Sequence, residues 1–436
     1  MVRTGMSLSP KLVAGLAVLV LFGCSYYFFF LFIPGMRPSL VARHLAGGYG
    51  YCNDFYPIWL ASGELFHGRD PYSPELTPRI ETALYGRALD RSTPGDAQVN
   101  MRAFAYPLYT ILLFAPLAAF SFPTVQIIIC VVLALLAALA VLWWLRALDP
   151  HFAFNGTAVA ICLALASYPV LEGIYSGQPG LLAGALIAGT VLALTRQRYV
   201  LAGILLPCAS IKPQLVLLVG LWLMVWVFAD LSERKGTVLS ALATSALLVA
   251  ASTWMLPNWF SGWWRMLSEY RRVSPPPLAE FVLGRVAGDA LSLFLIALAA
   301  WLCWKKRREP ANSEGFVLCT VFVLGITALV LPSTIAVYDQ FLLLPAALWL
   351  CIRPMRILRG SLPLRVLALM AIGALGWQWL TACGVAFASI VLPAIAHSPK
   401  LLLLPLRTAA SVPFALVAPL CFEVVQEIRT NAVPSC

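Results

Sequence analysis

The sequence predicts an all-α polytopic membrane protein, and three observations lead to that prediction. Hydrophobic residues make up 61% of the 436 residues and charged residues only 11%, and the mean hydropathy is +0.85. A soluble globular domain usually carries about twice that charged fraction. Apolar runs recur along the chain at the length that a bilayer requires, roughly 20 residues for each helix. Lysine and arginine clusters stand at the ends of several runs, which is typical of membrane topology signals.

Ten apolar segments are clear candidates for spans, and two more are irregular. Segment 107–121 is short, whereas 199–229 is too long for one straight helix and contains Lys212-Pro213. If both irregular segments cross, the count is about twelve, and residues 1–436 form a single integral-membrane domain. Gly23-Cys24 resembles a lipoprotein cleavage site, but the apolar run continues beyond it, so we expect an uncleaved first span. The ten clear candidates are 11–33, 123–145, 156–171, 180–195, 237–256, 286–304, 315–331, 337–352, 364–381 and 408–425.

The basic residues predict which side faces the cytoplasm. Lys305-Lys306-Arg307-Arg308 and the arginines at 353, 356 and 359 flank two runs on one side, which the positive-inside rule makes cytoplasmic. An even number of spans places both termini there too, in the plasma (inner) membrane of a bacterial type of cell. Arg196 and Arg198 conflict with twelve spans, since they would lie outside. Both arginines would lie on the cytoplasmic side if 107–121 is re-entrant and 199–229 is a hairpin.

Two large outer loops follow from this topology. The first, 34–106, contains seven arginines, seven acids and no lysine, a balance that favours a folded surface segment over a disordered tail. Within it, the apolar residues from Phe55 to Phe66 leave Ser62 and Glu64 free, which indicates an interfacial helix.

The second outer loop, 257–285, mixes aromatic residues with arginines and breaks at Pro275-Pro276-Pro277. Such a composition is typical of an anchor in the headgroup zone, and it can also stack on a sugar or pair with a lipid phosphate. Both interpretations stay open. The arginines that could hold a phosphate there are Arg271, Arg272 and Arg285.

Two charged residues stand where the chemistry of a membrane enzyme could lie. Asp54 opens the interfacial helix, and the aromatic residues Tyr51, Phe55, Tyr56 and Trp59 should partly desolvate it, which raises the pKa and the basicity of a carboxylate. A simply solvated acid is the alternative. Lys212 lies between two apolar runs, where a lysine is expensive unless it is functional or snorkels to the surface. Because Pro213 interrupts the helix, backbone carbonyls should be free to bind its ammonium.

Weaker signals lie in two short polar segments. Asp339, in Tyr338-Asp339-Gln340, could be a second polar group of an active site or an acid that favours a helix N-terminus. Glu172 precedes Ser176-Gly177-Gln178-Pro179, and Gln178 could be functional or simply cap a turn.

Several function classes lack their signatures in this sequence. The net charge of +11 is explained by topology, so we expect no nucleic-acid partner. There is no glycine-rich loop followed by lysine and Ser/Thr, and no Asp-x-Asp pair in the first loop, so we expect no metal-bound nucleotide sugar and no cofactor. The spacing of the eleven cysteines and four histidines indicates neither a metal site nor a disulfide framework. The two halves show no internal repeat of the kind that many transporters carry.

Five motifs, taken in order, resemble those of glycosyltransferase family 87. The resemblance covers roughly residues 50–350. It rests on Asp54-Phe55 with Trp59-x-Ala61-x-Gly63 and Gly68-Arg69-Asp70-Pro71-Tyr72, on Tyr106-Pro107, on Gly177-Gln178, on Ala202-Gly203 with Ile211-Lys212-Pro213-Gln214, and on Pro332-Ser333 with Tyr338-Asp339-Gln340. Two departures are Leu108, where a second proline is common, and Gln214, where histidine is common; both could reflect a different substrate.

The resemblance implies a membrane bundle of the GT-C superfamily and an inverting transferase. The implied donor is a polyprenyl-phosphate sugar, often mannose, and the implied acceptor is a lipid or glycan at the outer face. Asp54 would be the catalytic base, and Lys212 would hold the donor phosphate. Tyr106, Gln178, Tyr338, Asp339 and Gln340 would bind substrate. Two rival functions are a lipid or sugar transporter or flippase, which would not turn its substrate over, and a non-catalytic membrane scaffold, for which Asp54 would be dispensable.

Overall fold

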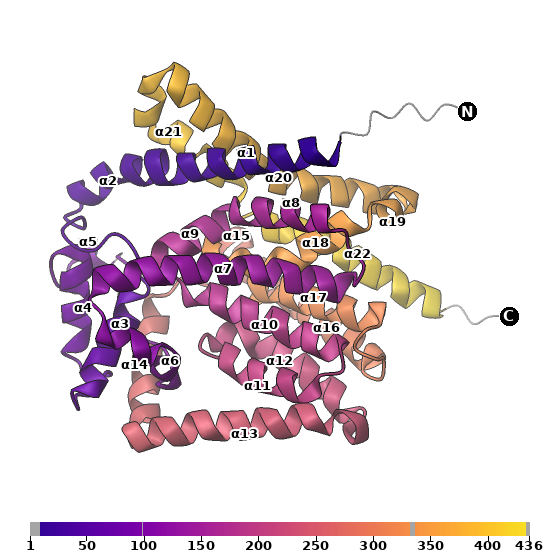
Figure 1. The fold of residues 1–436 in the computed structure, drawn as a ribbon, viewed down its shortest axis with the longest axis horizontal. Helices are drawn as coiled ribbons and strands as arrows, with labels where there is room; N and C mark the ends of the chain where they lie inside the picture. Colours follow the sequence, from indigo (N-terminus) through magenta and orange to yellow (C-terminus); the bar gives the residue numbers. More distant parts are fainter. Residues whose placement is uncertain (1–8, 98, 332–335, 433–436) are drawn as a thin grey trace.

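The computed structural model is all-helical and describes residues 9–97, 99–331 and 336–432 (Figure 1). Six helical stretches are long and apolar enough to cross a membrane. A seventh span results if α8 (Phe154–Leu165) and α9 (Tyr168–Ser176), which meet at 60°, count as one. The chain is therefore a multi-pass membrane protein. The six stretches are Pro10–Ala42, which joins α1 (Pro10–Tyr26), η1 (Tyr27–Phe32) and α2 (Ile33–Ala42); α7 (Phe122–Leu148); α13 (Leu231–Met255); α16 (Arg285–Lys306); α20 (Leu362–Val391); and Leu404–Gln426, which includes η5 (Leu404–Thr408) and most of α22 (Val412–Ala432).

The expectation of twelve complete spans is wrong, although all twelve segments contain helix. The remaining apolar helices are 10–17 residues long, shorter than a straight span needs. Proline begins several of these helices, such as α10 and α12, because it lacks an N–H and is best tolerated in the first turn of a helix. The short elements are α6 (Tyr109–Phe114) with η2 (Ala115–Ala119), α10 (Pro179–Thr195), α11 (Tyr199–Ala209), α12 (Pro213–Phe228), α17 (Glu314–Val330), and η3 (Val337–Leu343) with α18 (Leu344–Ile352).

Segment 199–229 folds as a hairpin, as one of the two sequence interpretations allowed. The ring of Tyr199, at the start of α11, lies 6.4 Å from the ring of Trp226, near the end of α12. The Tyr199 hydroxyl also donates to Glu233 at the start of α13, over 2.9 Å. The two helices therefore enter and leave at the same end of the bundle, and Lys212 lies at the tip. This arrangement puts Arg196 and Arg198, just before α11, at the same end of the bundle as Arg234 at the start of α13, and the conflict in the charge pattern disappears.

α17, on one side of residues 332–335, and η3 with α18, on the other side, form a second hairpin. The start of α17 and the end of α18 lie at the same end of the bundle. Arg353 and Arg356, just after α18, both form ion pairs with Glu314 at the start of α17. The far ends of α17 and η3 therefore meet Lys212 in the interior. Half-span helices of this kind leave backbone and side chains exposed at depth, which membrane proteins tolerate only where the segment lines a cavity or is covered by protein.

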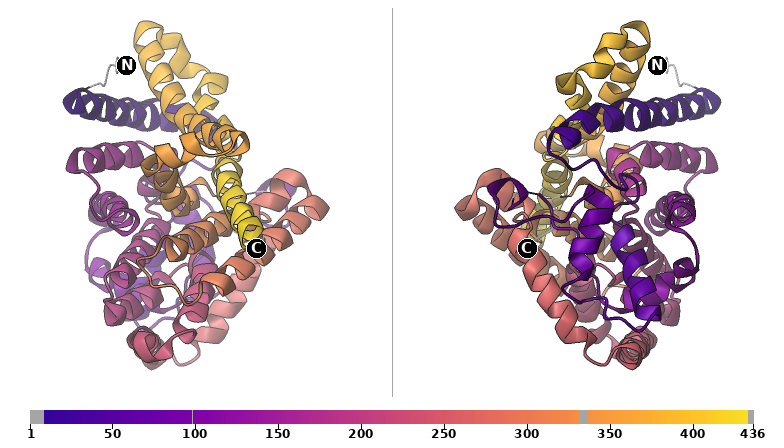
Figure 2. Two further views of the ribbon diagram at one scale, coloured as in Figure 1. Left: turned by 90° about the vertical axis from the view of Figure 1, so that its right-hand side faces the viewer. Right: turned by 90° about the vertical axis from the view of Figure 1, so that its left-hand side faces the viewer.

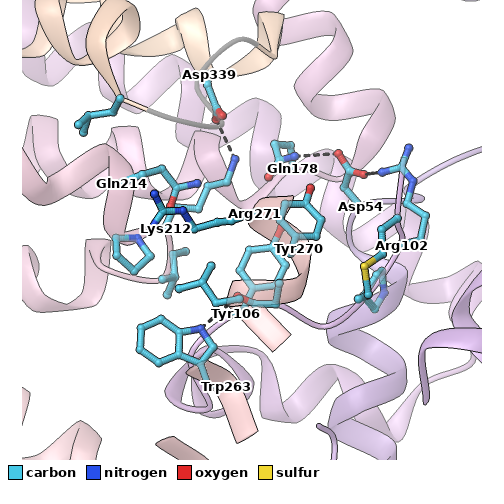
Figure 3. Close-up of a pocket in the computed structure, with 18 of the residues that line it drawn as sticks. Asp54, Arg102, Tyr106, Gln178, Lys212, Gln214, Trp263, Tyr270, Arg271 and Asp339 are labelled. Atoms are coloured by element: carbon cyan, nitrogen blue, oxygen red, sulfur yellow. Dashed lines mark hydrogen bonds and ion pairs between the residues drawn. The ribbon is translucent and has the colours of Figure 1, made fainter. Parts of the chain in front are cut away.

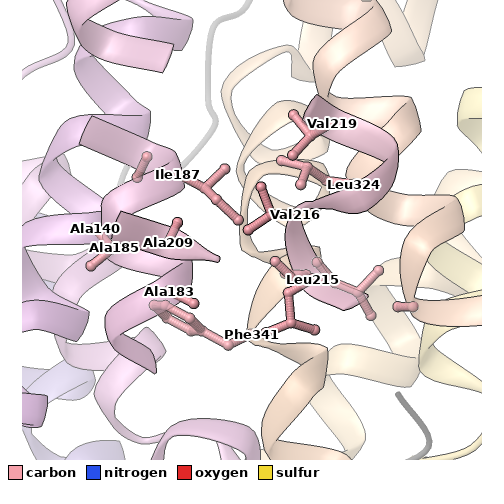
Figure 4. Packing of buried hydrophobic residues seen from close by; sticks show 14 of the residues in the cluster. Ala140, Ala183, Ala185, Ile187, Ala209, Leu215, Val216, Val219, Leu324 and Phe341 are labelled. Carbon is pink, nitrogen blue, oxygen red and sulfur yellow. The ribbon is translucent and has the colours of Figure 1, made fainter. Parts of the chain in front are cut away.

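Apolar packing fixes the positions of these short helices (Figure 4). Alanine and glycine line α10, so neighbouring helices approach it closely, as is common between membrane helices. A Cβ at Gly184 would lie 2.6 Å from the ring of Phe341, in η3, and one at Gly189 would lie 3.2 Å from Trp143, in α7. A substitution at Gly184 would therefore push η3, which carries Asp339, away from α10, and one at Gly189 would disturb the contact between α10 and α7.

The first outer loop folds into a compact unit, as its charge balance predicts. It contains α3 (Tyr56–Phe66), α4 (Leu76–Tyr85) and α5 (Pro94–Ala97). Acids and arginines pair within it: Arg87 binds Asp96 at 2.6 Å and Arg91 binds Glu81 at 2.7 Å. A helix, α3, forms where an interfacial helix was expected, but Ser62 and Glu64 are buried, which corrects the expectation that they stay free.

Glu64 is buried because two arginines bind it. Arg69 lies at 2.5 Å and Arg79 at 3.0 Å from its carboxylate. Hydrogen bonds from Arg69 and then Arg79 lower the pKa of Glu64 to about 2. A carboxyl whose folded pKa lies below its unfolded value stabilises the fold above the unfolded pKa and loses that contribution as the pH falls toward the folded pKa.

We therefore expect Glu64→Gln to lower the melting temperature at pH 7, and the difference from wild type to shrink between about pH 5 and pH 2. Thermal unfolding of both detergent-purified proteins between pH 2 and pH 7 measures this difference in melting temperature. Glu75→Gln, on the same loop and exposed, is the matched control. A constant Glu64→Gln difference at all pH values would mean that the ion pairs do not stabilise the loop.

The second outer loop packs against the first. It contains α14 (Trp259–Val273) and α15 (Leu278–Leu283). The Trp263 indole donates to the carbonyl of Ala105 over 3.1 Å, and Arg265 donates to the carbonyl of Tyr72 over 3.0 Å. The second loop therefore forms a wall beside the first loop.

The two ends of the bundle differ in composition. α1 begins and α22 ends at the same end, and the folded loop 43–106 lies at the other (Figure 1). Arg234 donates to the carbonyls of Arg307 and Arg308, which joins two basic clusters at the first end. α19 (Pro354–Arg359) follows the second hairpin. η4 (Pro393–His397) and α21 (Pro399–Leu402) project with part of α20 from one edge (Figure 2).

Candidate active site

A cavity of about 410 Å³ opens between the first loop, α14 and the inner ends of the short helices (Figure 3). Polar side chains from distant parts of the chain meet in it, while α12, α14 and the segment 101–106 supply apolar and aromatic walls. The charged and amide groups that line it are Asp54, Arg102, Gln178, Lys212, Gln214, Arg271 and Asp339.

Asp54 lies just before α3 with 8% of its surface exposed. Its backbone N–H donates to the carbonyl of Ser176 over 2.9 Å. Oδ1 accepts from Arg102, and Oδ2 accepts from Nε2 of Gln178 over 2.7 Å. The aromatic residues were expected to desolvate this carboxylate partly; it is buried, but polar groups hold both of its oxygens.

The aromatic neighbours of Asp54 pack elsewhere. The ring of Phe55 contacts Phe114 at 4.9 Å, and the ring of Tyr56 contacts Phe122 at 4.8 Å. These contacts anchor the start of α3 to α6 and α7. The aromatic residues therefore fix the position of the acid and do not form its immediate environment.

A tight turn brings Gln178 to Asp54. Gly177 ends α9 with φ of 67°, a conformation that glycine adopts at little cost. A Cβ there would lie 2.9 Å from the Cβ of Phe55, so only glycine permits this approach. Gln178 then occupies the N-cap of α10, but its side chain makes no capping bond. It bonds Asp54 instead, and its Oε1 has no hydrogen-bond partner among the described residues.

Lys212 occupies the N-cap of α12 and is 6% exposed. Its Nζ lies 2.8 Å from Oδ1 of Asp339 and 4.9 Å from the ring centroid of Tyr338. Backbone carbonyls were expected to bind this ammonium; a carboxylate 127 positions away in the chain does so. Asp339 lies in the first turn of η3 and also lines the cavity, so its position is compatible with both interpretations of its role.

The start of α10 approaches this ion pair closely. A Cβ at Gly180 would lie 2.8 Å from Oδ1 of Asp339 and 3.3 Å from Nζ of Lys212. The positive N-terminal ends of α10 and α12 thus point to the same part of the cavity as the lysine, and such ends favour anions.

Comparison with known families decides what kind of protein carries this cavity. The model of glycosyltransferase family 87 matches residues 104–332, more than half of the chain. The chain belongs to glycosyltransferase family 87. The resemblance drawn from the five motifs is therefore confirmed, and the protein is a glycosyltransferase. No curated protein matches the chain.

The matched range holds only part of the cavity of this family 87 glycosyltransferase. Tyr106, Gln178, Lys212 and Arg271 lie within it, whereas Asp54 and Asp339 lie outside it. The roles of these residues stay predictions that rest on geometry. Pro332-Ser333, part of the late motif, lie outside the described residues.

Some of the other predicted site residues line the cavity, and the rest lie outside it. Tyr106, Tyr338 and Arg271 line the cavity. Burial raises the pKa of the Tyr106 phenol well above its usual range, so the phenol stays a neutral hydrogen-bond donor at physiological pH. Gln340 is buried outside the cavity, where it donates to the carbonyl of Ala409 over 2.7 Å.

Two predicted arginines also lie outside the cavity of this glycosyltransferase. Arg272 and Arg285 are exposed and do not contribute to the cavity lining. Of the three arginines of the second loop that were predicted to hold a phosphate, Arg271 is the one among the described residues that lines the cavity. The helix spacing explains the difference, because adjacent residues on a helix point in directions about 100° apart.

Sequence reasoning missed Arg102 and Tyr270. Arg102 counted only as one of seven loop arginines, and no local pattern identifies its partner. The loop's charge balance indicated that arginines and acids pair, but the pairing with Asp54 depends on how residues 48 positions apart fold together. Tyr270 lies one turn before Ser274 on α14, and its side chain turns toward the cavity (Figure 3).

Proposed function

We propose that this glycosyltransferase moves a sugar, with mannose the first candidate, from a polyprenyl-phosphate donor to a lipid or glycan acceptor at the outer face, with inversion at the anomeric carbon. The observation that supports it is the opposition of two groups across one cavity. A carboxylate, Asp54, lies on one side, and an ammonium, Lys212, lies on the other beside two helix N-termini (Figure 3).

The Lys212 side suits a phosphate. One ammonium hydrogen goes to Asp339, and an ammonium has three. Arg271 reaches the same cavity. The N-terminal amides of α10 and α12 add partial positive charge, and together these groups outweigh the single charge of Asp339. The leaving phosphate would bind here.

The walls suit a sugar on a lipid. Tyr106, Trp263 and Tyr270 line the cavity, and aromatic faces of this kind stack on sugar rings. Leu217 lines the cavity and is 52% exposed on the outside of α12. An isoprenoid chain could therefore leave the cavity toward the bilayer, whereas a nucleotide would meet an apolar wall there.

The proposed reaction needs one proton transfer and one displacement. Asp54 takes the proton from an acceptor hydroxyl, and the resulting oxygen attacks the anomeric carbon from the face opposite the phosphate. The bond between the anomeric carbon and the phosphate oxygen breaks, and its electron pair leaves with the polyprenyl phosphate. Arg102 and Gln178 hold the carboxylate in place, so no free energy is needed to orient it during the reaction.

The basic end of the bundle would face the cytoplasm. It gathers Arg196, Arg234, the cluster 305–308 and the arginines after α18, as the positive-inside rule requires. Both termini would then be cytoplasmic, and the cavity would open at the outer face of a bacterial-type plasma membrane.

Sugar transfer by purified protein in liposomes tests the proposal. With polyprenyl-phosphate mannose and a mixed lipid acceptor extract, we expect a mannosylated product whose anomeric configuration is opposite to that of the donor; NMR of the product measures it. A nucleotide sugar should give no product. Retention of configuration would contradict direct displacement. Movement of the donor across the membrane without any product would favour a flippase.

A further inference from the structure

A second hollow lies at the basic end, away from the candidate active site. This lipid crevice, as we name it, has a volume of about 590 Å³ between α12 and α16. Its walls are apolar and its rim is cationic: it is lined by Leu221, Met224 and Phe228 of α12 and by Trp304, Arg307 and Arg308 at the end of α16.

The α12 side of the crevice is one face of the helix. Leu221, Met224 and Phe228 follow each other at spacings of three and four, which places them on one stripe. They are 48%, 47% and 59% exposed. In a multi-pass membrane protein such a stripe faces lipid chains. Here the stripe forms one side of a concave surface, because the end of α16 lines the other side.

The cationic rim is built into the fold. Arg234 is 3% exposed and donates to the carbonyls of Trp226, Arg307 and Arg308, at 2.6, 2.9 and 3.3 Å. Its guanidinium also stacks on the ring of Trp226 at 3.8 Å. A buried arginine thus ties the turn after α16 to the end of α12, which holds Arg307 and Arg308 at the mouth of the crevice.

The charge of the rim is not cancelled locally. None of the residues that line the crevice is acidic. The nearest acid in the sequence, Glu309, binds Lys306 at 3.0 Å and accepts from Ser313 over 2.7 Å. The guanidinium of Arg307 lies 3.9 Å over the ring of Trp304, an arrangement that keeps its positive charge and offers its edge to an anion.

We propose that the lipid crevice binds an anionic glycerophospholipid of the leaflet at the basic end, with its phosphate between Arg307 and Arg308 and an acyl chain along the exposed face of α12. Basic pockets between helices at the headgroup level favour such lipids over zwitterionic ones. The proposed phosphate position differs from that of the sugar donor, because Lys212 lies at the opposite end of α12, about 24 Å away along 16 residues.

Native mass spectrometry of protein taken from nanodiscs of defined composition tests this. In phosphatidylcholine with phosphatidylglycerol, the wild type should retain phosphatidylglycerol preferentially. Arg307→Gln with Arg308→Gln should weaken that retention about thirty-fold. Arg359→Gln, an exposed arginine at the same end, should change it little. Met224→Trp, which fills the crevice and leaves both arginines in place, should also weaken retention.

Three results would overturn the proposal. The first is equal retention by the wild type and the double arginine variant, and the second is equal loss in Arg359→Gln. The third comes from nanodiscs of phosphatidylcholine with polyprenyl phosphate: if the wild type keeps that lipid, the double arginine variant loses it, and the wild type shows no preference for phosphatidylglycerol, the crevice belongs to the isoprenoid substrate or product. Thermal unfolding of each variant separates lost binding from lost folding.

Discussion

Asp54→Asn is expected to lower sugar transfer by about 10²–10⁴-fold, the usual contribution of a general base. Asparagine keeps the shape of the side chain and one oxygen that can accept from Arg102 or Gln178, but it cannot take a proton from the acceptor hydroxyl. Arg102 loses its ionic partner, yet its side chain is 24% exposed, so water can replace part of the interaction. The variant should therefore fold.

The measurement is the initial rate in liposomes at saturating donor, beside thermal unfolding of the same preparation. Glu75→Gln, which neutralises an exposed acid of the same loop, is the control and should transfer sugar at the wild-type rate. Near-full turnover by Asp54→Asn would exclude the carboxylate as the base. A loss of rate with a lowered melting temperature would point to a structural role, and Arg102→Gln should then show the same loss of stability.

Lys212→Met is expected to fail in two ways, because this lysine has two tasks. Loss of a preorganised charge at the leaving phosphate should lower transfer by about 10²–10³-fold. Asp339, 2% exposed, would be left without its ionic partner, and breaking a buried pair in this way costs about 3–5 kcal/mol of stability.

A double variant separates the two tasks. Lys212→Met with Asp339→Asn removes both charges, so the stability should return toward that of the wild type. Transfer should stay low, since the phosphate still lacks its cation. Lys235→Met, an exposed lysine at the basic end, is the matched control. If the double variant regains transfer together with stability, Lys212 serves only the fold.

The fold class could be predicted from the sequence, because it depends on local composition. The cost of burying an unpaired peptide group in lipid requires helix wherever the chain is apolar, and all twelve apolar segments are helical. The break at Lys212-Pro213 could also be predicted, since proline removes a donor from the chain. The charge balance of the first loop likewise indicated that it folds.

Hydropathy could not decide how many of these helices cross. The segment 199–229 is largely apolar, and its return depends on the packing of Tyr199 against Trp226 and on the close approach of Leu205 that Gly189 allows. Composition is the same for a hairpin and for two spans. The conflict of Arg196 and Arg198 with twelve spans was the one sequence signal that pointed to the hairpin.

The sequence by itself determined that this protein is a helical membrane protein, and its motifs identified the family and singled out Asp54 and Lys212. The tertiary structure decided their partners, Arg102 and Gln178 for the acid and Asp339 for the lysine. It also decided that Glu64 is buried and that Gln340 lies outside the cavity. The physical reason is the separation along the chain of the residues that interact. Helix formation and membrane insertion depend on neighbours along the chain, whereas an ion pair depends on packing that joins residues up to 127 positions apart.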